Sequence, residues 1–188
     1  VYSHTATGIT TAGEGTIVRN NIIYSNPFGI SETPDVTGAL IENNTVYNSL
    51  CGGIVAGSAA SGSHTIVRNN ILSTSSTGTG CYAVLSALFP GASDDGYGGV
   101  SIDNSGSYPY VDLVNNLFYN NGWNVDAGNE NVVATNFSTF ARGTDYGTAA
   151  EIEGIPSALA NATMTDNIAG IDPLFTDADG ADDTLGGV

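Results

Sequence analysis

The sequence contains no lysine and only three arginines, against 19 acidic residues, which gives a formal net charge of −16. Binding to nucleic acid requires clusters of basic side chains that displace counterions from the phosphates, and this composition excludes it. Adhesion to an anionic membrane surface is excluded for the same reason. The acidity keeps an exported protein soluble, and it also suits divalent cations or a salty medium.

Long apolar runs are also missing. No stretch approaches the ~18–20 consecutive apolar residues that span a bilayer, so we expect no direct insertion into a membrane. No secretory signal is visible. The chain begins at Val1 within repeat-like sequence and stops at Gly187-Val188 without completing any pattern. We interpret it as a segment of a longer protein.

One phrase occurs four times: a short β-prone run, an Asn-Asn pair and a second β-prone run. The second asparagine of each pair is Asn21, Asn44, Asn70 or Asn116, so the spacings are 23, 26 and 46 residues. A repeat of this length is typical of a solenoid, in which stacked coils bury apolar sides that one coil cannot bury alone.

The first unit shows how one coil is built. Residues 16–18 form a β-prone run, and Asn20-Asn21 interrupts it with residues that tolerate the left-handed region. Residues 22–24 resume the strand, residues 25–27 turn the chain, and Gly29-Ile30 begins a third strand. Stacking such coils places the Asn pairs about 4.8 Å apart. The sequence therefore predicts an asparagine ladder in which side-chain amides bond from coil to coil.

The phrase, followed by Gly-Ile, resembles the right-handed parallel β-helix repeat of pectate-lyase-like proteins. The Asp-Pro-Leu-Phe-x-Asp-x-Asp-Gly phrase at residues 172–180 resembles the end of β-helix domains in large bacterial exported surface proteins. The resemblance implies an all-β right-handed parallel β-helix of about five coils over residues 1–125. The 46-residue spacing between Asn70 and Asn116 contains only Asn104 as an internal candidate, which is too close to Asn116 for another coil, so we predict an insertion at about residues 86–109. We expect residues 126–188 to form the end of the solenoid and an irregular acidic tail. The fold alone does not set the function, because it hosts lyases, hydrolases, epimerases, adhesins and surface proteins.

The two cysteines precede the expected third strands of consecutive coils. Cys51 comes before Gly52-Gly53-Ile54, and Cys81 comes before Tyr82-Ala83-Val84. Stacked positions lie within the Cα separation that a disulfide needs. We predict a Cys51–Cys81 bridge and therefore an extracellular or cell-surface location. The alternative is two thiols buried in the core.

The expected insertion contains carboxylates and tyrosines, which could bind a sugar by hydrogen bonds and ring stacking, or hold a cation. These ligand-binding candidates are Asp94, Asp95, Tyr97, Asp103, Tyr108 and Tyr110. The alternative is an Asp-Asp-Gly turn that only decorates a loop.

The tail contains Asp177, Asp179, Asp182 and Asp183 around Gly180. Hard oxygen ligands at alternate positions are those that Ca²⁺ takes, so these four residues are a candidate calcium site. The alternative is a solvated acidic turn.

The repeat fades after Trp123. Further on, Ser157 is placed to cap a short helix.

No residue is assigned a catalytic role. Lyases of this fold are expected to have an Arg or Lys base beside Ca²⁺-binding aspartates, but Arg19 and Arg68 share one repeat position with Glu42 between them, which predicts a structural Arg–Glu–Arg stack. The Gly-His-Gly phrase of the hydrolases is missing, and so is the Asp-Pro-His-Asp phrase of the epimerases. His4 and His64 lack metal-ligand spacing.

Two functions remain open. The first is an extracellular structural or adhesive solenoid segment of a surface or filament protein, whose partners are carbohydrate or neighbouring copies stacked end to end. The second is a polysaccharide lyase or glycoside hydrolase.

Three Asn-x-Ser/Thr sequons occur, at Asn43, Asn136 and Asn161. A sequence so rich in Asn and Thr is expected to contain such matches by chance.

Overall fold

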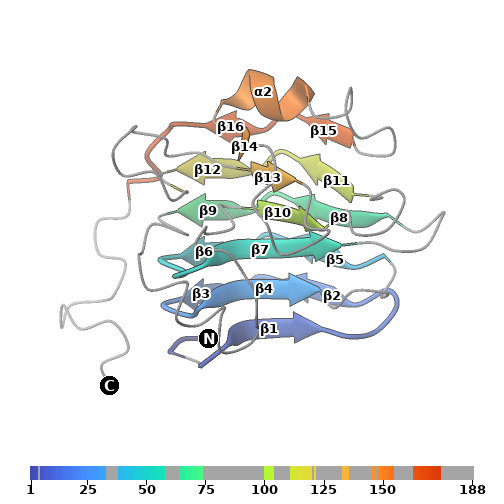
Figure 1. Cartoon of the computed structure of the whole chain (residues 1–188), viewed down its shortest axis with the longest axis vertical. Helices are drawn as coiled ribbons and strands as arrows, with labels where there is room; N and C mark the ends of the chain where they lie inside the picture. The colour runs from blue at the N-terminus through green and yellow to red at the C-terminus, as the bar shows by residue number, and fades with distance from the viewer. Residues whose placement is uncertain are drawn as a thin grey trace.

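The computed structural model describes residues 1–3, 5–32, 38–57, 64–73, 100–103, 111–119, 121, 133–135, 145–146, 148–154 and 163–174. These residues form a stack of coils with a strand on each of three sides (Figure 1). We name the three sheets by the place of their strands in a coil. The first strand precedes the Asn-Asn corner, the second follows it, and the third comes after the next turn.

Each sheet runs along the whole stack. The first-strand sheet contains β2 (Ile17–Arg19), β5 (Leu40–Glu42), β8 (Thr65–Arg68), β11 (Val111–Val114) and β15 (Thr163–Thr165). The second-strand sheet contains β3 (Ile22–Tyr24), β6 (Thr45–Tyr47), β9 (Ile71–Ser73), β12 (Leu117–Tyr119) and β16 (Ile168–Ala169). The third-strand sheet contains β1 (Thr7–Thr11), β4 (Phe28–Glu32), β7 (Gly52–Gly57), β10 (Val100–Asp103), β13 (Val133–Thr135) and β14 (Asp145–Tyr146).

All the pairings between these strands are parallel except that of β13 with β14. The chain is therefore a nearly all-β parallel solenoid, as the repeat predicted. The register places equivalent repeat positions side by side, for example Val18 beside Ile41 and Ile41 beside Val67.

The core consists mainly of columns of inward side chains that run from strand to strand. The first-strand column is Val18, Ile41, Val67, Leu113 and Met164, and the second-strand column is Ile23, Val46, Leu72, Phe118 and Ala169. The third-strand sheet adds Ile9, Ile30 and Ile54. Each side chain stacks on its equivalents above and below, so the coils share one continuous apolar interior.

The expected insertion at 86–109 was partly wrong. Strand β10 lies inside that range, and it pairs with β7 so that Val100 is beside Ile54. This strand is the third side of its coil, a place that the sequence had given to Tyr82-Ala83-Val84, which lie outside the described residues. The 46-residue spacing between Asn70 and Asn116 is therefore one long coil.

The expected fading of the repeat after Trp123 also needs correction, because β15 and β16 continue the first-strand and second-strand sheets. A short helix, α2 (Ala149–Gly154), lies at this end of the stack beside β15 (Figure 1). This helix is not the one predicted at Ser157, which lies outside the described residues and stays a prediction. Thr148 and Glu151 form a reciprocal capping box, with Oγ1 of Thr148 accepting from the amide of Glu151 and Oε2 of Glu151 accepting from that of Thr148.

Among the described residues, no helix has the length and apolar character that a membrane span requires.

Glycines in the third strands allow the coils to approach one another closely. A Cβ at Gly29 would clash with the backbone oxygen of Gly53 and with Cγ1 of Val46. Both atoms are held in place, one by the sheet and the other by the core. Only glycine fits at this position without moving a neighbouring coil.

We predict that Gly29→Ala lowers the free energy of unfolding by about 1–3 kcal/mol or more through overpacking. Gly13→Ala is the matched control, because a Cβ there has Oγ1 of Thr16 as its nearest neighbour, at 3.4 Å. Chemical denaturation of the two variants measures the difference. Equal stabilities would contradict the close approach at Gly29.

Candidate functional surfaces

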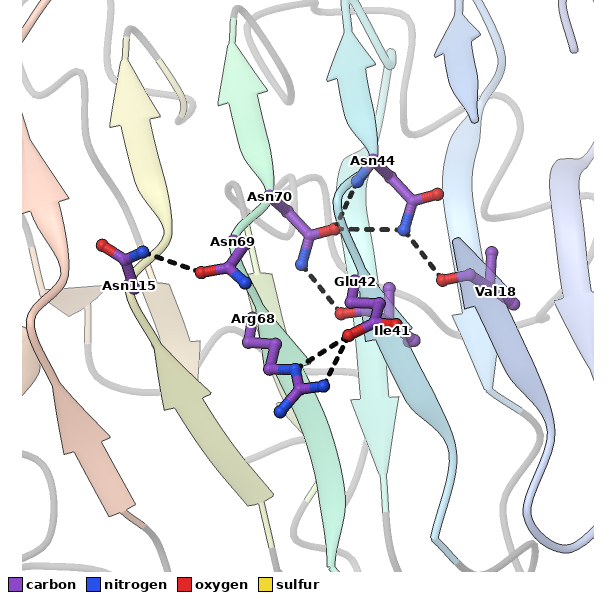
Figure 2. Close-up of polar contacts among 8 residues, drawn as sticks. All are labelled: Val18, Ile41, Glu42, Asn44, Arg68, Asn69, Asn70 and Asn115. Atoms are coloured by element: carbon purple, nitrogen blue, oxygen red, sulfur yellow. Dashed lines mark hydrogen bonds and ion pairs between the residues drawn. The ribbon is translucent and has the colours of Figure 1, made fainter. Parts of the chain in front are cut away.

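The asparagine ladder fixes one corner of every coil, and it positions all the outward surfaces. The four predicted members, Asn21, Asn44, Asn70 and Asn116, lie in one column. Nδ2 of each of the first three donates to Oδ1 of the next at 3.0 Å. Figure 2 shows the Asn44–Asn70 link. The predicted ladder is confirmed.

Within the column, each interior amide satisfies its full hydrogen-bonding capacity. Asn44 donates from Nδ2 to Oδ1 of Asn70 and to the backbone oxygen of Val18, both at 3.0 Å. Its own Oδ1 accepts from Nδ2 and from the backbone nitrogen of Asn21. Asn70 repeats this pattern one coil further on, with the carbonyl of Ile41 as its backbone acceptor. Two donors and two acceptor positions are thus paired away from water.

The first residue of each pair has a different task. Asn20, Asn43, Asn69 and Asn115 all have φ between 54° and 57°. Asparagine adopts this left-handed conformation at little cost, so the strand can turn sharply and direct the next side chain inward. The first residues themselves are exposed, and Nδ2 of Asn115 donates to Oδ1 of Asn69 at 2.7 Å (Figure 2).

The ladder has a fifth member that the sequence analysis missed. Asn167 is buried, and its Oδ1 accepts from the backbone nitrogen and from Nδ2 of Asn116, both at 3.1 Å. Asp166 takes the left-handed corner position with φ 55°. The signal was present as Met164-Thr-Asp-Asn-Ile168, in which aspartate replaces the first asparagine.

The outward face of the first-strand sheet carries paired charges. Nε and Nη2 of Arg68 both donate to Oε2 of Glu42, at 2.9 and 2.7 Å (Figure 2). The Glu42 side chain is 11% exposed and the Arg68 side chain 45%. His64 Nδ1 lies 3.1 Å from Asp112 Oδ1. Each pair joins neighbouring strands of the stack, so these charges support the packing of the coils.

The predicted Arg–Glu–Arg stack is confirmed as an order along the sheet, because Arg19, Glu42 and Arg68 lie side by side in the register. Among the described residues, an ion pair joins Glu42 to Arg68 but not to Arg19.

The outward face of the second-strand sheet has no formal charge at its described positions. One column consists of Ile22, Thr45, Ile71, Leu117 and Ile168, and the other of Tyr24, Tyr47, Ser73 and Tyr119. The ring of Tyr2 stacks on that of Tyr24, with centroids 5.2 Å apart. We call this surface the tyrosine face. Its described side chains are mainly aliphatic and aromatic, with Ser73 buried, on a molecule of strongly negative net charge.

The ligand and metal candidates from the sequence lie almost wholly outside the described residues. This is true of Asp94, Asp95, Tyr97, Tyr108 and Tyr110, and of the four tail aspartates, Asp177, Asp179, Asp182 and Asp183. Asp103 ends β10, with its backbone beside Gly57. In the part of the chain that is described, no three His, Cys, Asp or Glu side chains come together as a metal site would require.

Cys51 is fully buried and is not a free thiol. Its predicted partner, Cys81, lies outside the described residues, so the bridge between them stays a prediction.

Comparison with known proteins adds no relative: no family model, no curated protein and no solved structure matches the chain.

We predict that Asn70→Ala lowers the free energy of unfolding by about 2–4 kcal/mol, because it removes four hydrogen bonds and leaves buried partners unsatisfied. Asn21→Ala removes two bonds at a partly exposed site, and it should cost about 1 kcal/mol. Equilibrium unfolding of both variants checks the order. A larger loss at Asn21 would contradict a ladder whose interior links matter most.

Proposed function

We propose that this chain is a structural or adhesive segment of an extracellular surface or filament protein, built as a right-handed β-helix of about five coils in the manner of pectate-lyase-like proteins. The observation that carries the proposal is how the outward charges are used. The Arg68 and His64 side chains are each engaged with a carboxylate of a neighbouring strand. Such pairing supports rigidity, whereas a lyase needs a base that is available to the substrate.

The adhesive part of the proposal rests on the tyrosine face. A surface of tyrosine and aliphatic side chains provides apolar contact together with phenolic hydroxyls, which suits the apolar faces and hydroxyl groups of a sugar chain. The net charge of −16 repels anionic polymers. We therefore propose a neutral polysaccharide as the ligand of this face.

Retention on an immobilised neutral glucan or xylan tests this binding. Tyr24→Ser combined with Tyr119→Ser should weaken it at least tenfold. Ile66→Ser combined with Val114→Ser is the control, since these residues lie on the outward face of the first-strand sheet and are also half-buried. Equal losses in both double variants, or no retention of the unmodified protein, would contradict the tyrosine face as an adhesive surface.

The catalytic alternative is tested separately. Incubation with pectin, alginate and other uronic-acid polymers should release no unsaturated products, because among the described residues no cluster of acidic side chains could hold the cation that proton abstraction also needs. Accumulation of such products would replace the structural proposal with a polysaccharide lyase.

Calcium is the proposed stabiliser of the acidic tail, through Asp177, Asp179, Asp182 and Asp183. Carboxylate oxygens at alternate positions suit Ca²⁺, and an ion that binds only the folded state raises the melting temperature. We expect EDTA to lower that temperature, and we expect the Asp179→Asn/Asp182→Asn variant to show no such shift. An identical melting temperature with Ca²⁺ and with EDTA would mean that the four aspartates are merely solvated.

A further inference from the structure

One sequence motif combines a ladder residue with an exposed side chain that the stack does not use. Asn43-Asn44-Thr45 has the Asn-x-Thr pattern of an N-glycosylation acceptor. The structure places its three residues in different environments. Asn43 is exposed, Asn44 is the buried ladder residue, and Thr45 is half-buried on the outward side of β6.

The Asn43 side chain is exposed and takes no part in the hydrogen bonds and packing that hold the coil together. Its backbone nitrogen donates to the backbone oxygen of Arg68, which fixes the corner. Its side-chain amide has no hydrogen bond with any described residue, in contrast to the inward amide of Asn44. A large substituent on Nδ2 of Asn43 would therefore extend into solvent without disturbing the ladder or the core.

We propose that Asn43 is a site of N-linked glycosylation, which rests on the proposed export of the chain. In the reaction, Nδ2 of Asn43 forms a bond to the anomeric carbon of an oligosaccharide, and the bond from that carbon to the diphosphate of a lipid-linked donor breaks. The amide loses one proton, and the lipid diphosphate leaves.

The transfer has to precede stacking of the coils. In the folded chain, the backbone nitrogen of Asn44 donates to Oδ1 of Asn70 and that of Thr45 donates to the backbone oxygen of Asn21. A transferase that binds the backbone amides of the acceptor segment would have to break both hydrogen bonds. The modified side chain then lies at the exposed corner once the ladder closes.

The solenoid supplies its own controls. Asn20, Asn69 and Asn115 are exposed at the same corner, and their φ angles of 57°, 54° and 54° are close to the 55° of Asn43. They differ from Asn43 because isoleucine or leucine follows two positions later. Ile71 occupies the same column as Thr45 in the neighbouring coil. The sequon hydroxyl can therefore be removed by substituting Thr45 and introduced in the next coil by substituting Ile71, with the same backbone conformation at both corners.

The test is secretion of the full chain from a glycosylating host, followed by peptide mapping before and after enzymatic deglycosylation. We expect a glycopeptide that contains Asn43, its loss in Thr45→Val, and a new glycopeptide at Asn69 in Ile71→Thr. Peptide mapping separates these sites from the sequons at Asn136 and Asn161.

Secreted protein that lacks a glycan at Asn43 would overturn this inference and leave the structural and adhesive role untouched. A glycan at Asn43 that persists in Thr45→Val would also overturn it, because the sequon hydroxyl would then have no part in selecting the site.

Discussion

The hydrogen bond between successive ladder asparagines is the constraint on which the rest of the solenoid depends. Each link is buried, and each amide also bonds to backbone groups of the coil before it, so a shift of one coil by a single residue would break four bonds at once. Such a slip would also turn every inward side chain of a strand outward. The ladder and the apolar columns therefore enforce the same register, one by polar pairing and the other by packing.

Two adjacent residues with different roles form each corner. The first adopts the left-handed conformation and faces solvent, and the second enters the column. Asparagine serves both needs, but only the second position requires the full set of amide donors and acceptors. Asp166 illustrates the difference, because it replaces the first asparagine without loss of the corner, while Asn167 beside it keeps the ladder bonds.

The parts of the fold that the sequence predicted are those with a local chemical marker. The Asn pairs gave the corner, the first and second strands, and four of the five ladder members among the described residues. The third strand of the long coil was misplaced because no asparagine marks it. A weaker marker was available, since the sequence Gly98-Gly99-Val100 is similar to Gly52-Gly53-Ile54, and Val100 pairs with Ile54. Helix α2 was not predicted because Thr148 and Glu151, three residues apart, were not considered as a capping box.

The candidate sites were less predictable than the fold. Aspartates and tyrosines in a loop have no periodic neighbours that fix their positions, so their sequence gives composition but no geometry. The outward columns are different, because the register converts a sequence position into a place on a surface. Tyr24 and Tyr119 come from strands far apart in the chain, yet the parallel pairing puts them in one column.

This separation of inward from outward columns explains how such a solenoid acquires a function. The inward residues and the ladder must satisfy packing and hydrogen bonding in every coil, so they leave little freedom. The outward residues of a strand contact only their neighbours along the sheet, so their residue types can differ from one sheet of the solenoid to another. The first-strand sheet uses that freedom for ion pairs between coils, which strengthen the stack. The second-strand sheet has no formal charge at its described outward positions on a chain of net charge −16, so these positions add no electrostatic repulsion toward an approaching anionic surface.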